Sequence, residues 1–277
     1  MTSPALQEIV ALLGCPAAGN PAQYLFERAI AAAGLDWRFL TVDVAADRLA
    51  EAIGGVDAMG FRGCLLSGPL EHLVMPTLAH ASPAARFAGA ASLIERKADG
   101  LFGHMTDGRG VVEALRSHAE LSGARLLLAG AGPTGRATAL ELALAGVAEI
   151  IVTDRAPESA VTLIEALRDL DTEVEITPLP FEATIAIPER VGIVVASRRA
   201  DEPRSHFGGL RSDLVVADTE LIEQPSALVA ATQKAGGCVI DGLEVHVEKT
   251  AIDFQVLTGS EPDPDMLREA LEDFLSA

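Results

Sequence analysis

The chain has 277 residues, of which 49% are hydrophobic and only 4% aromatic, and it carries a formal net charge of −19. This charge excludes nucleic acid and anionic membrane surfaces as partners, and no apolar run reaches membrane-spanning length or forms a secretion signal. The three cysteines are far apart and lack the spacing of metal ligands, so we expect a reduced, cytoplasmic protein without a metal site.

Strands and helices alternate through the first hundred residues, which predicts one α/β unit. The apolar patterns and their Pro and Gly boundaries predict strands at 8–13, 37–44 and 63–67, helices at 21–33, 46–53 and 71–81, and a β-ribbon of 91–95 and 103–105 with a turn at 97–100.

The alternation continues to the end of the chain. The pattern predicts helices at 108–121 and 137–145, strands at 124–129, 150–153, 173–177, 192–196, 214–217 and 238–240 with helices between the later ones, and closing helices at 243–257 and 263–276. The fold class is therefore α/β, with an N-terminal α/β lobe, a Rossmann-type doubly wound lobe and a cleft between them. We place the first lobe at 1–106, completed by 241–277, and the second at 107–240.

A glycine turn joins the strand at 124–129 to the helix that follows it. Gly130, Gly132 and Gly135 fit the G-x-G-x-x-G spacing of dinucleotide-binding turns. The first glycine permits a tight turn, the second lets the backbone approach a pyrophosphate, and the third lets the helix pack closely with its positive end toward the anion. We expect a nicotinamide dinucleotide here, and an ordinary glycine-rich turn that binds nothing is the alternative.

The end of the next strand bears on which dinucleotide binds. Asp154 stands where a carboxylate would hold the ribose 2′-hydroxyl of NAD and repel the 2′-phosphate of NADP. Arg155 could instead stack on adenine or pair with that phosphate, and Asp154 could merely cap the turn before Pro157. We favour NAD over NADP. The predicted cofactor-binding set is Gly130, Gly132, Pro133, Thr134, Gly135, Asp154, Arg155, Ala196 and Ser197.

Several short motifs accompany the glycine turn: Gly14-Cys15-Pro16, Ser67-Gly68-Pro69-Leu70, Gly89-Ala90, Thr106-Asp107-Gly108 and Asp241-Gly242-Leu243. Together with the order of elements, these motifs resemble the shikimate/quinate dehydrogenase family. The resemblance implies a substrate-binding and catalytic first lobe, a Rossmann lobe for NADP or NAD, final helices that return to the first lobe, and a place in aromatic amino acid biosynthesis.

The residues at the family's substrate-binding positions differ from the usual ones. Asn20 stands at the first position of a Ser-x-Ser pair, Ser92 stands for an Asn, and Lys249 stands for a Gln, while Ser67 keeps a comparable hydroxyl. We take these four residues as the candidate substrate-binding set. For Lys249, an ordinary solvated helix residue is the alternative.

The family pairs a Lys with an Asp to relay the proton of the reacting hydroxyl. Asp107 matches that aspartate, but Glu71 occupies the position of the lysine. His72 follows directly and is a candidate proton shuttle. The candidate catalytic residues are therefore Asp107, Glu71 and His72, with a helix cap as the other role open to Asp107 and a surface position as the alternative for His72.

Three functional hypotheses follow. The first is an NAD(P)-dependent oxidoreductase that moves a hydride between nicotinamide and an alcohol or carbonyl substrate, which need not be shikimate. The second is a catalytically inactive dinucleotide-binding sensor or interaction protein, motivated by the replaced lysine. Chemistry like that of glutamyl-tRNA reductase or methylene-tetrahydrofolate dehydrogenase rests on architecture alone. We expect a small-molecule substrate and a monomer or homodimer.

Overall fold

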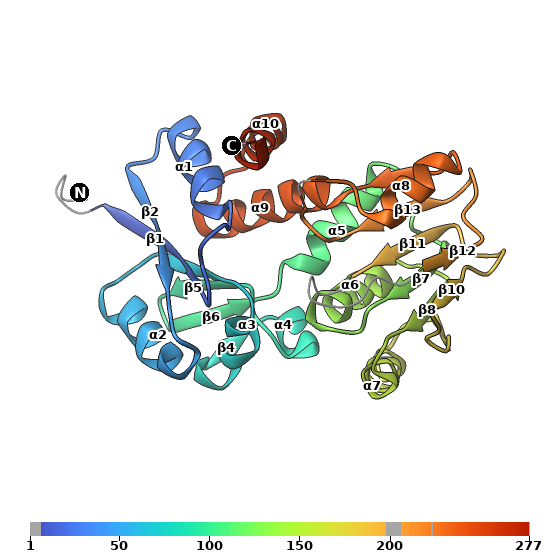
Figure 1. Ribbon diagram of the computed structural model, residues 1–277. Helices are drawn as coiled ribbons and strands as arrows, with labels where there is room; N and C mark the ends of the chain where they lie inside the picture. Colours follow the sequence, from blue (N-terminus) through green and yellow to red (C-terminus); the bar gives the residue numbers. More distant parts are fainter. Residues whose placement is uncertain (1–6, 198–205, 223, 277) are drawn as a thin grey trace. The chain divides into compact units, whose positions relative to one another are not determined.

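The structure of the chain, a computed structural model, describes residues 7–197, 206–222 and 224–276. The chain divides into two compact units, one formed by Met1–Thr106 with Lys249–Ala277 and the other by Asp107–Glu248. Each unit contains its own six-stranded sheet with helices packed against it (Figure 1). The predicted α/β class is confirmed. In the described part of the chain, no helix combines the length and the apolar character needed to cross a membrane.

The sheet of the first unit has the order β2-β1-β3-β5-β6-β4. Strand β1 is parallel to β2 and β3, while β5 is antiparallel to β3 and β6 and forms the predicted ribbon with β6. The strands are β1 (Glu8–Gly14), β2 (Trp37–Asp43), β3 (Gly63–Leu66), β4 (His80–Ala81), β5 (Leu93–Lys97) and β6 (Gly100–His104).

The helices of the first unit come from both ends of the chain. Phe26 lies between Phe39 and Phe254, with ring centroids at 4.9 and 5.8 Å, so the late helix α9 packs against α1 as the family resemblance implies. The helical elements are α1 (Ala22–Ala32), the 3-10 helix η1 (Ala46–Arg48), α2 (Leu49–Ala58), α3 (Leu70–Leu73), the 3-10 helix η2 (Met75–Thr77), α4 (Pro83–Ala88), α9 (Gly242–Thr258), which begins in the second unit, and α10 (Pro264–Ser276).

The predicted helix at 71–81 is wrong. The chain instead forms the single turn of α3, the 3-10 turn of η2 and the short strand β4, and α4 follows it. Pro76 lies in η2 and has no N–H to donate to a continuing helix, so the helix ends before it. The residues after Pro76 pair with β6 instead, where His80 lies opposite Phe102.

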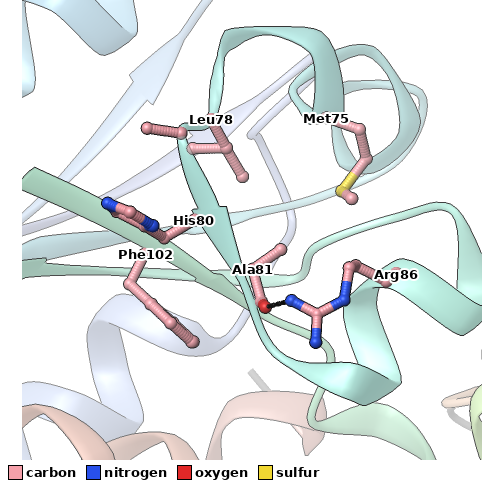
Figure 2. A pocket seen from close by; sticks show the side chains of 7 residues that line it. Met75, Leu78, His80, Ala81, Arg86 and Phe102 are labelled. Carbon is pink, nitrogen blue, oxygen red and sulfur yellow. Dashed lines mark hydrogen bonds between the residues drawn. The ribbon is translucent and has the colours of Figure 1, made fainter.

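A small open cavity of about 260 Å³ lies beside this rearranged segment of the first unit (Figure 2). Its walls are Met75, Leu78, Ala79, His80, Ala81, Arg86 and Phe102. The Arg86 guanidinium donates to the carbonyl oxygen of Ala81 and so forms part of one wall. None of the predicted site residues is among these seven.

The sheet of the second unit is parallel throughout, with the order β14-β13-β11-β7-β8-β9. A separate parallel pair joins β10 to β12. The elements are α5 (Asp107–Arg116), β7 (Arg125–Ala129), α6 (Pro133–Leu144), β8 (Glu149–Thr153), α7 (Pro157–Arg168), β9 (Glu175–Pro178), β10 (Thr184–Ala186), β11 (Ile193–Ala196), β12 (His206–Gly208), β13 (Val215–Asp218), α8 (Ala227–Lys234) and β14 (Cys238–Ile240).

Helices do not separate all of the later strands, contrary to the prediction. Between β9 and β11 the chain forms strand β10 and no helix. Pro178, Pro180 and Pro188 lie in or beside this connection, and each removes a backbone donor that a helix interior would need. The connection between β11 and β13 lies partly outside the described residues.

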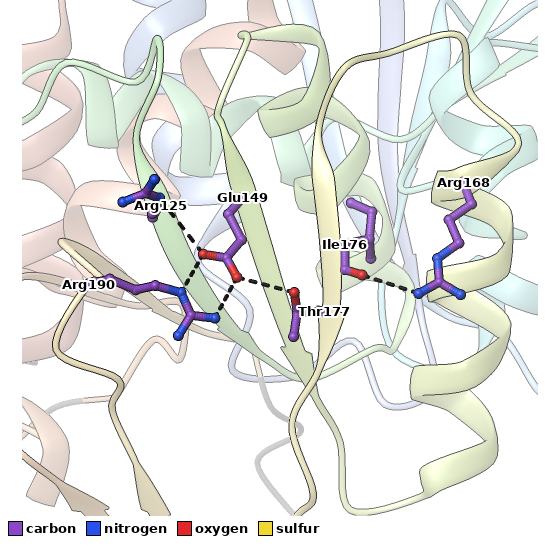
Figure 3. Close-up of polar contacts among 6 residues, drawn as sticks. All are labelled: Arg125, Glu149, Arg168, Ile176, Thr177 and Arg190. Carbon is purple, nitrogen blue, oxygen red and sulfur yellow. Dashed lines mark hydrogen bonds and ion pairs between the residues drawn. The ribbon is translucent and has the colours of Figure 1, made fainter.

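A buried carboxylate connects three strands near their amino ends, at the end of the sheet where the parallel strands begin (Figure 3). Glu149 is only 2% exposed and accepts two hydrogen bonds from Arg190, from Nε at 2.8 Å and from Nη2 at 2.6 Å. Thr177 donates a third at 3.1 Å, and Arg125 lies 4.0 Å away. The Arg190 hydrogen bonds hold the pKa of Glu149 below its ordinary value, and they outweigh the opposing effect of burial.

We expect Glu149→Gln to lower the free energy of unfolding at pH 7 by about 1–2 kcal/mol, because the charge-assisted bonds to Arg190 are lost. The folded-state pKa of Glu149 is lowered from an unfolded value of about 4.3, so this contribution is present above that pH and is lost as pH falls through the folded-state pKa. The difference between the two proteins in urea unfolding should therefore shrink as pH falls below about 4.3 and disappear below the folded-state pKa of Glu149. A difference that does not change between pH 7 and acid pH would contradict this account.

Candidate functional site

The glycine turn lies where the strand order of the second sheet reverses direction. From β7 the chain adds β8 and β9 on one side, then β11, β13 and β14 on the other. In open α/β sheets this switch point, at the carboxyl ends of the two central strands, is where ligands bind. Gly130 follows β7 and Ser197 follows β11, and the N–H of Ser197 donates to the carbonyl oxygen of Ala129 at 2.8 Å.

The three glycines of the turn have different surroundings. Gly130 has φ +120°, and a Cβ added there would lie 1.7 Å from the carbonyl oxygen of Ser197. A Cβ on Gly135 would lie 2.0 Å from the carbonyl oxygen of Gly130. A Cβ on Gly132, in contrast, meets no atom of the described residues within 4 Å. The first and third glycines are required by packing, whereas the second leaves one face of the backbone open.

That open face lies at the amino end of α6. Gly132 is the residue before the helix and provides no side-chain cap, Pro133 takes the first helical position, and Thr134 follows. The early N–H groups of a helix lack intrahelical acceptors, and the helix dipole adds positive potential at this end. A dinucleotide diphosphate fits this environment, so the residues present match the predicted cofactor.

Asp154 holds the glycine turn in shape. Its Oδ2 accepts the Ala131 N–H at 2.6 Å, and its Oδ1 accepts the Ala156 N–H at 2.7 Å. The capping role that the sequence left open is therefore present, and the same carboxylate also reaches the turn itself. Arg155 is exposed beside it. The carboxylate remains close enough to the turn for its charge to act on whatever binds there.

Asp107 is the first residue of α5. Its Oδ2 is buried, and among the described residues it has no hydrogen-bond partner. Native structures rarely leave a buried carboxylate oxygen unpaired, so such an atom is a candidate for contact with a ligand. The next residue, Gly108, is fixed by packing, because a Cβ there would lie 2.3 Å from the backbone of Ala137 in α6.

Two of the predicted substrate-binding residues belong to one buried polar network in the first unit. The hydroxyl oxygens of Ser92 and Thr106 are 3.2 Å apart, and Ser92 Oγ also accepts the Thr106 N–H. Thr106 Oγ1 donates to Asp253 Oδ1 at 2.6 Å, and Lys249 Nζ donates to Asp253 Oδ2 at 2.7 Å. Asp253 is 1% exposed and Lys249 is 16% exposed. The network therefore pairs the ammonium of Lys249 inside the protein, against the solvated alternative.

Thr106 and Asp253 are members of this network that the sequence reasoning missed. Asp253 lies four residues after Lys249 on the predicted closing helix, the spacing at which opposite charges meet on one helix face. That spacing was the available signal. No local pattern could have paired Asp253 with Thr106, because 147 residues separate them in the sequence.

The other predicted residues of the first unit lie at the ends of its elements. Asn20 Oδ1 accepts the Ala22 N–H at 2.9 Å where α1 begins. Ser67 follows β3 and is half-buried, and its Oγ would lie 2.7 Å from a Cβ on Gly14. Glu71 is half-buried on α3, while His72 is exposed with Nδ1 3.4 Å from the carbonyl oxygen of Gly89.

Comparison with known families gives two adjacent matches. A model described as the shikimate dehydrogenase substrate binding domain matches residues 12–94, and one described as shikimate/quinate 5-dehydrogenase matches residues 113–212. Among curated proteins, the shikimate dehydrogenase (NADP(+)) of Streptococcus pyogenes is 30% identical over 283 residues, covering 96% of both chains. That of Geobacter metallireducens is 26% identical over 269 residues, covering 94% of both.

Solved structures give the same result. The ligand-free 5-ketofructose reductase of a Gluconobacter species superposes with a TM-score of 0.90 at 28% identity, covering 97% of this chain and 99% of that one. Shikimate 5-dehydrogenase from Listeria monocytogenes, in complex with shikimate and NAD, superposes with a TM-score of 0.87 at 24% identity over 98% and 99%. The chain therefore belongs to the shikimate/quinate dehydrogenase family of NAD(P)-dependent oxidoreductases.

Proposed function

We propose that the chain moves a hydride between a nicotinamide dinucleotide and the alcohol or carbonyl carbon of a neutral polyhydroxy substrate, and that shikimate is not this substrate. The observation that carries the proposal is the glycine turn, with Gly130 and Gly135 packed against backbone and Gly132 open at the amino end of α6. When bound, the nicotinamide accepts or donates the hydride. The family membership supports this class of reaction.

Charge supports a substrate without a carboxylate. Glu71 takes the place of the family lysine, so a negative group replaces a positive one at that position. The ammonium of Lys249 is balanced by the buried carboxylate of Asp253 at 2.7 Å, which leaves little net positive charge for an anionic substrate. One structural relative, at 28% identity, is named a 5-ketofructose reductase. A ketose and its reduced form are neutral polyhydroxy compounds.

Asp107 handles the proton in this proposal. When an alcohol is oxidised, its hydroxyl proton must leave as the hydride departs. The acceptor we assign is the Oδ2 of Asp107, which has no hydrogen-bond partner in the described part of the chain. In the reverse direction the same carboxyl group returns the proton to the carbonyl oxygen. Glu71 and His72 are the candidates to exchange this proton with solvent, and Asn20, Ser67, Ser92 and Lys249 are the candidates to bind substrate hydroxyls.

We expect Asp107→Asn to lower kcat with the best substrate by about 100-fold or more, because the amide cannot accept the proton. The substrate is first found by screening ketoses, polyols and hydroxy acids, shikimate included, for interconversion of the oxidised and reduced nucleotide. Asp263→Asn is the matched control, since Asp263 also lies at a helix start and accepts the Asp265 N–H at 3.0 Å. Unchanged turnover in Asp107→Asn would remove Asp107 from the mechanism.

The finer proposal is that NAD is preferred over NADP. The Asp154 carboxylate next to the turn would repel a 2′-phosphate, although curated relatives are named as NADP(+)-dependent. Asp154→Asn removes the charge and keeps an acceptor for one of the two backbone N–H groups. We expect it to raise the affinity for NADPH relative to NADH by about 10-fold, measured by fluorescence titration of both nucleotides. A wild-type protein that binds NADPH more tightly would refute the NAD preference.

The replacement of the family lysine by Glu71 favours a second candidate function, a dinucleotide-binding protein without catalysis. It differs from the first in one observable way. If calorimetry detects nucleotide binding but no compound in the screen is turned over, the binding protein without catalysis is supported. Robust turnover of any compound rejects it. Absence of binding at millimolar nucleotide would contradict both.

A further inference from the structure

Three side chains of the second unit form a chain of contacts that the proposed function does not use. Cys238 begins β14, an edge strand of the parallel sheet, His118 follows α5, and Glu244 lies in the first turn of α9. The Sγ of Cys238 lies 3.6 Å from Nδ1 of His118, and Nε2 of His118 lies 2.7 Å from Oε1 of Glu244. Cys238 and Glu244 lie 120 and 126 positions from His118 in the sequence, and both contact its imidazole.

The order of these contacts is that of an activated nucleophile. Glu244 accepts the Nε2–H of the imidazole, which fixes the ring and leaves Nδ1 as the acceptor for the thiol proton. Proton transfer from Sγ to Nδ1 would give a thiolate beside an imidazolium, and the Glu244 carboxylate stabilises the imidazolium charge. A nucleophile, a base and a group that orients the base are the three parts that such a site requires.

Exposure together with the contact to His118 separates Cys238 from the other two thiols. Cys238 is exposed, and the side chains of His118 and Glu244 are 30% and 17% exposed, so the imidazole is held while the sulfur remains accessible. Cys64 is fully buried, and burial raises its pKa to about 12, which keeps it a thiol. Cys15 is exposed, but within the described part of the chain its side chain makes no hydrogen bond.

A metal site does not explain the cluster. Within residues 7–197, 206–222 and 224–276, no group of three or more His, Cys, Asp or Glu side chains is arranged to hold a metal ion. The three side chains also lie apart from the glycine turn, which follows β7. Strand β14 is at one edge of the sheet, β13 and β11 lie between it and β7, and β8 and β9 are on the other side of β7. The cluster is therefore a separate feature of the unit.

We propose that Cys238 is a reactive nucleophilic thiol, held by His118 and Glu244, whose reaction partners are peroxides. The thiolate attacks one oxygen of the peroxide, an S–O bond forms, and the O–O bond breaks as it takes up the two electrons from sulfur. The leaving hydroxide or alkoxide takes the proton from the His118 imidazolium. The products are a sulfenic acid on Cys238 and water or an alcohol, so atoms and electrons balance.

Competitive labelling of the full chain tests this proposal, with iodoacetamide as the probe and mass spectrometry to follow each cysteine. At pH 7 we expect Cys238 to react about 10-fold faster than Cys15, because the His118 imidazole contacts the Cys238 Sγ and can take its proton. His118→Gln and Glu244→Gln should each slow Cys238 and leave Cys15 unchanged. His206→Gln, which removes another exposed histidine of this unit, is the matched control.

Sulfenic acid formation is followed in the same proteins by treatment with hydrogen peroxide and trapping with dimedone. We expect the dimedone adduct on Cys238 in wild-type protein and in His206→Gln, and a loss of most of it in His118→Gln. Equal rates for Cys238 and Cys15, or a fast Cys238 that does not depend on His118, would overturn the proposal. Far-UV circular dichroism of each variant shows that the fold is retained, and none of these readouts requires the dinucleotide or a substrate.

Discussion

Replacing Gly130 with alanine is expected to lower the free energy of unfolding of the second unit by about 3–5 kcal/mol. The backbone at Gly130 has φ +120°, which a residue with a Cβ rarely adopts, and the added Cβ would lie 1.7 Å from the carbonyl oxygen of Ser197. Both costs are incurred whether or not a nucleotide binds. Urea unfolding followed by circular dichroism measures the loss.

Gly132→Ala is the matched control, and its expected effect is different. A Cβ at this position meets no atom of the described residues within 4 Å, and the backbone φ of −71° suits alanine, so stability should change little. Nucleotide affinity should nevertheless fall by about 10- to 100-fold, because the methyl group occupies the face at which a diphosphate approaches. If Gly132→Ala binds NAD(H) as tightly as wild type, the turn is not the dinucleotide site.

Replacing Asp253 with alanine is expected to cost about 3–5 kcal/mol of stability in the first unit. The buried carboxylate accepts hydrogen bonds from Thr106 and from Lys249. Its removal leaves the largely buried ammonium of Lys249 without the carboxylate that balances its charge. Breaking a buried pair by deleting one partner costs more than the pair itself contributes. Denaturant unfolding of the single variant measures this cost.

A double variant separates the buried charge from simple loss of packing. Lys249→Met combined with Asp253→Leu replaces both charges by apolar groups of similar size, and we expect its stability to lie within about 2 kcal/mol of wild type. If the stability loss of the double variant equals the sum of the losses in the Lys249→Met and Asp253→Leu single variants, the two side chains do not act as a pair.

The sequence was most informative where function depends on contiguous residues. The glycine spacing, the apolar strand before it and the acidic residue after the next strand predicted β7, α6 and β8 to within a few residues. The surroundings of each glycine match the mechanical role that the motif assigns to it, because these roles depend on local backbone geometry. The motifs around the turn also supported the family, which the comparisons show.

The sequence was least informative where proline and tertiary pairing compete with helical periodicity. The pattern at 71–81 has apolar residues at helical spacing, yet Pro76 interrupts it and β4 pairs with β6. The strand β10 was missed for a related reason, since three residues pair with β12 and no local alternation marks them.

Short stretches of consecutive residues determined the α/β class, the glycine turn and the family of this protein. The tertiary structure alone decided that Asp253 meets Thr106, that Glu149 on β8 meets Thr177 on β9 and Arg190, and that Cys238 meets His118. The physical reason is that each of these contacts is made by side chains brought together by folding from distant positions. Periodicity and spacing carry information over a few turns of helix or a few residues of strand, whereas burial and charge pairing are properties of the packed chain.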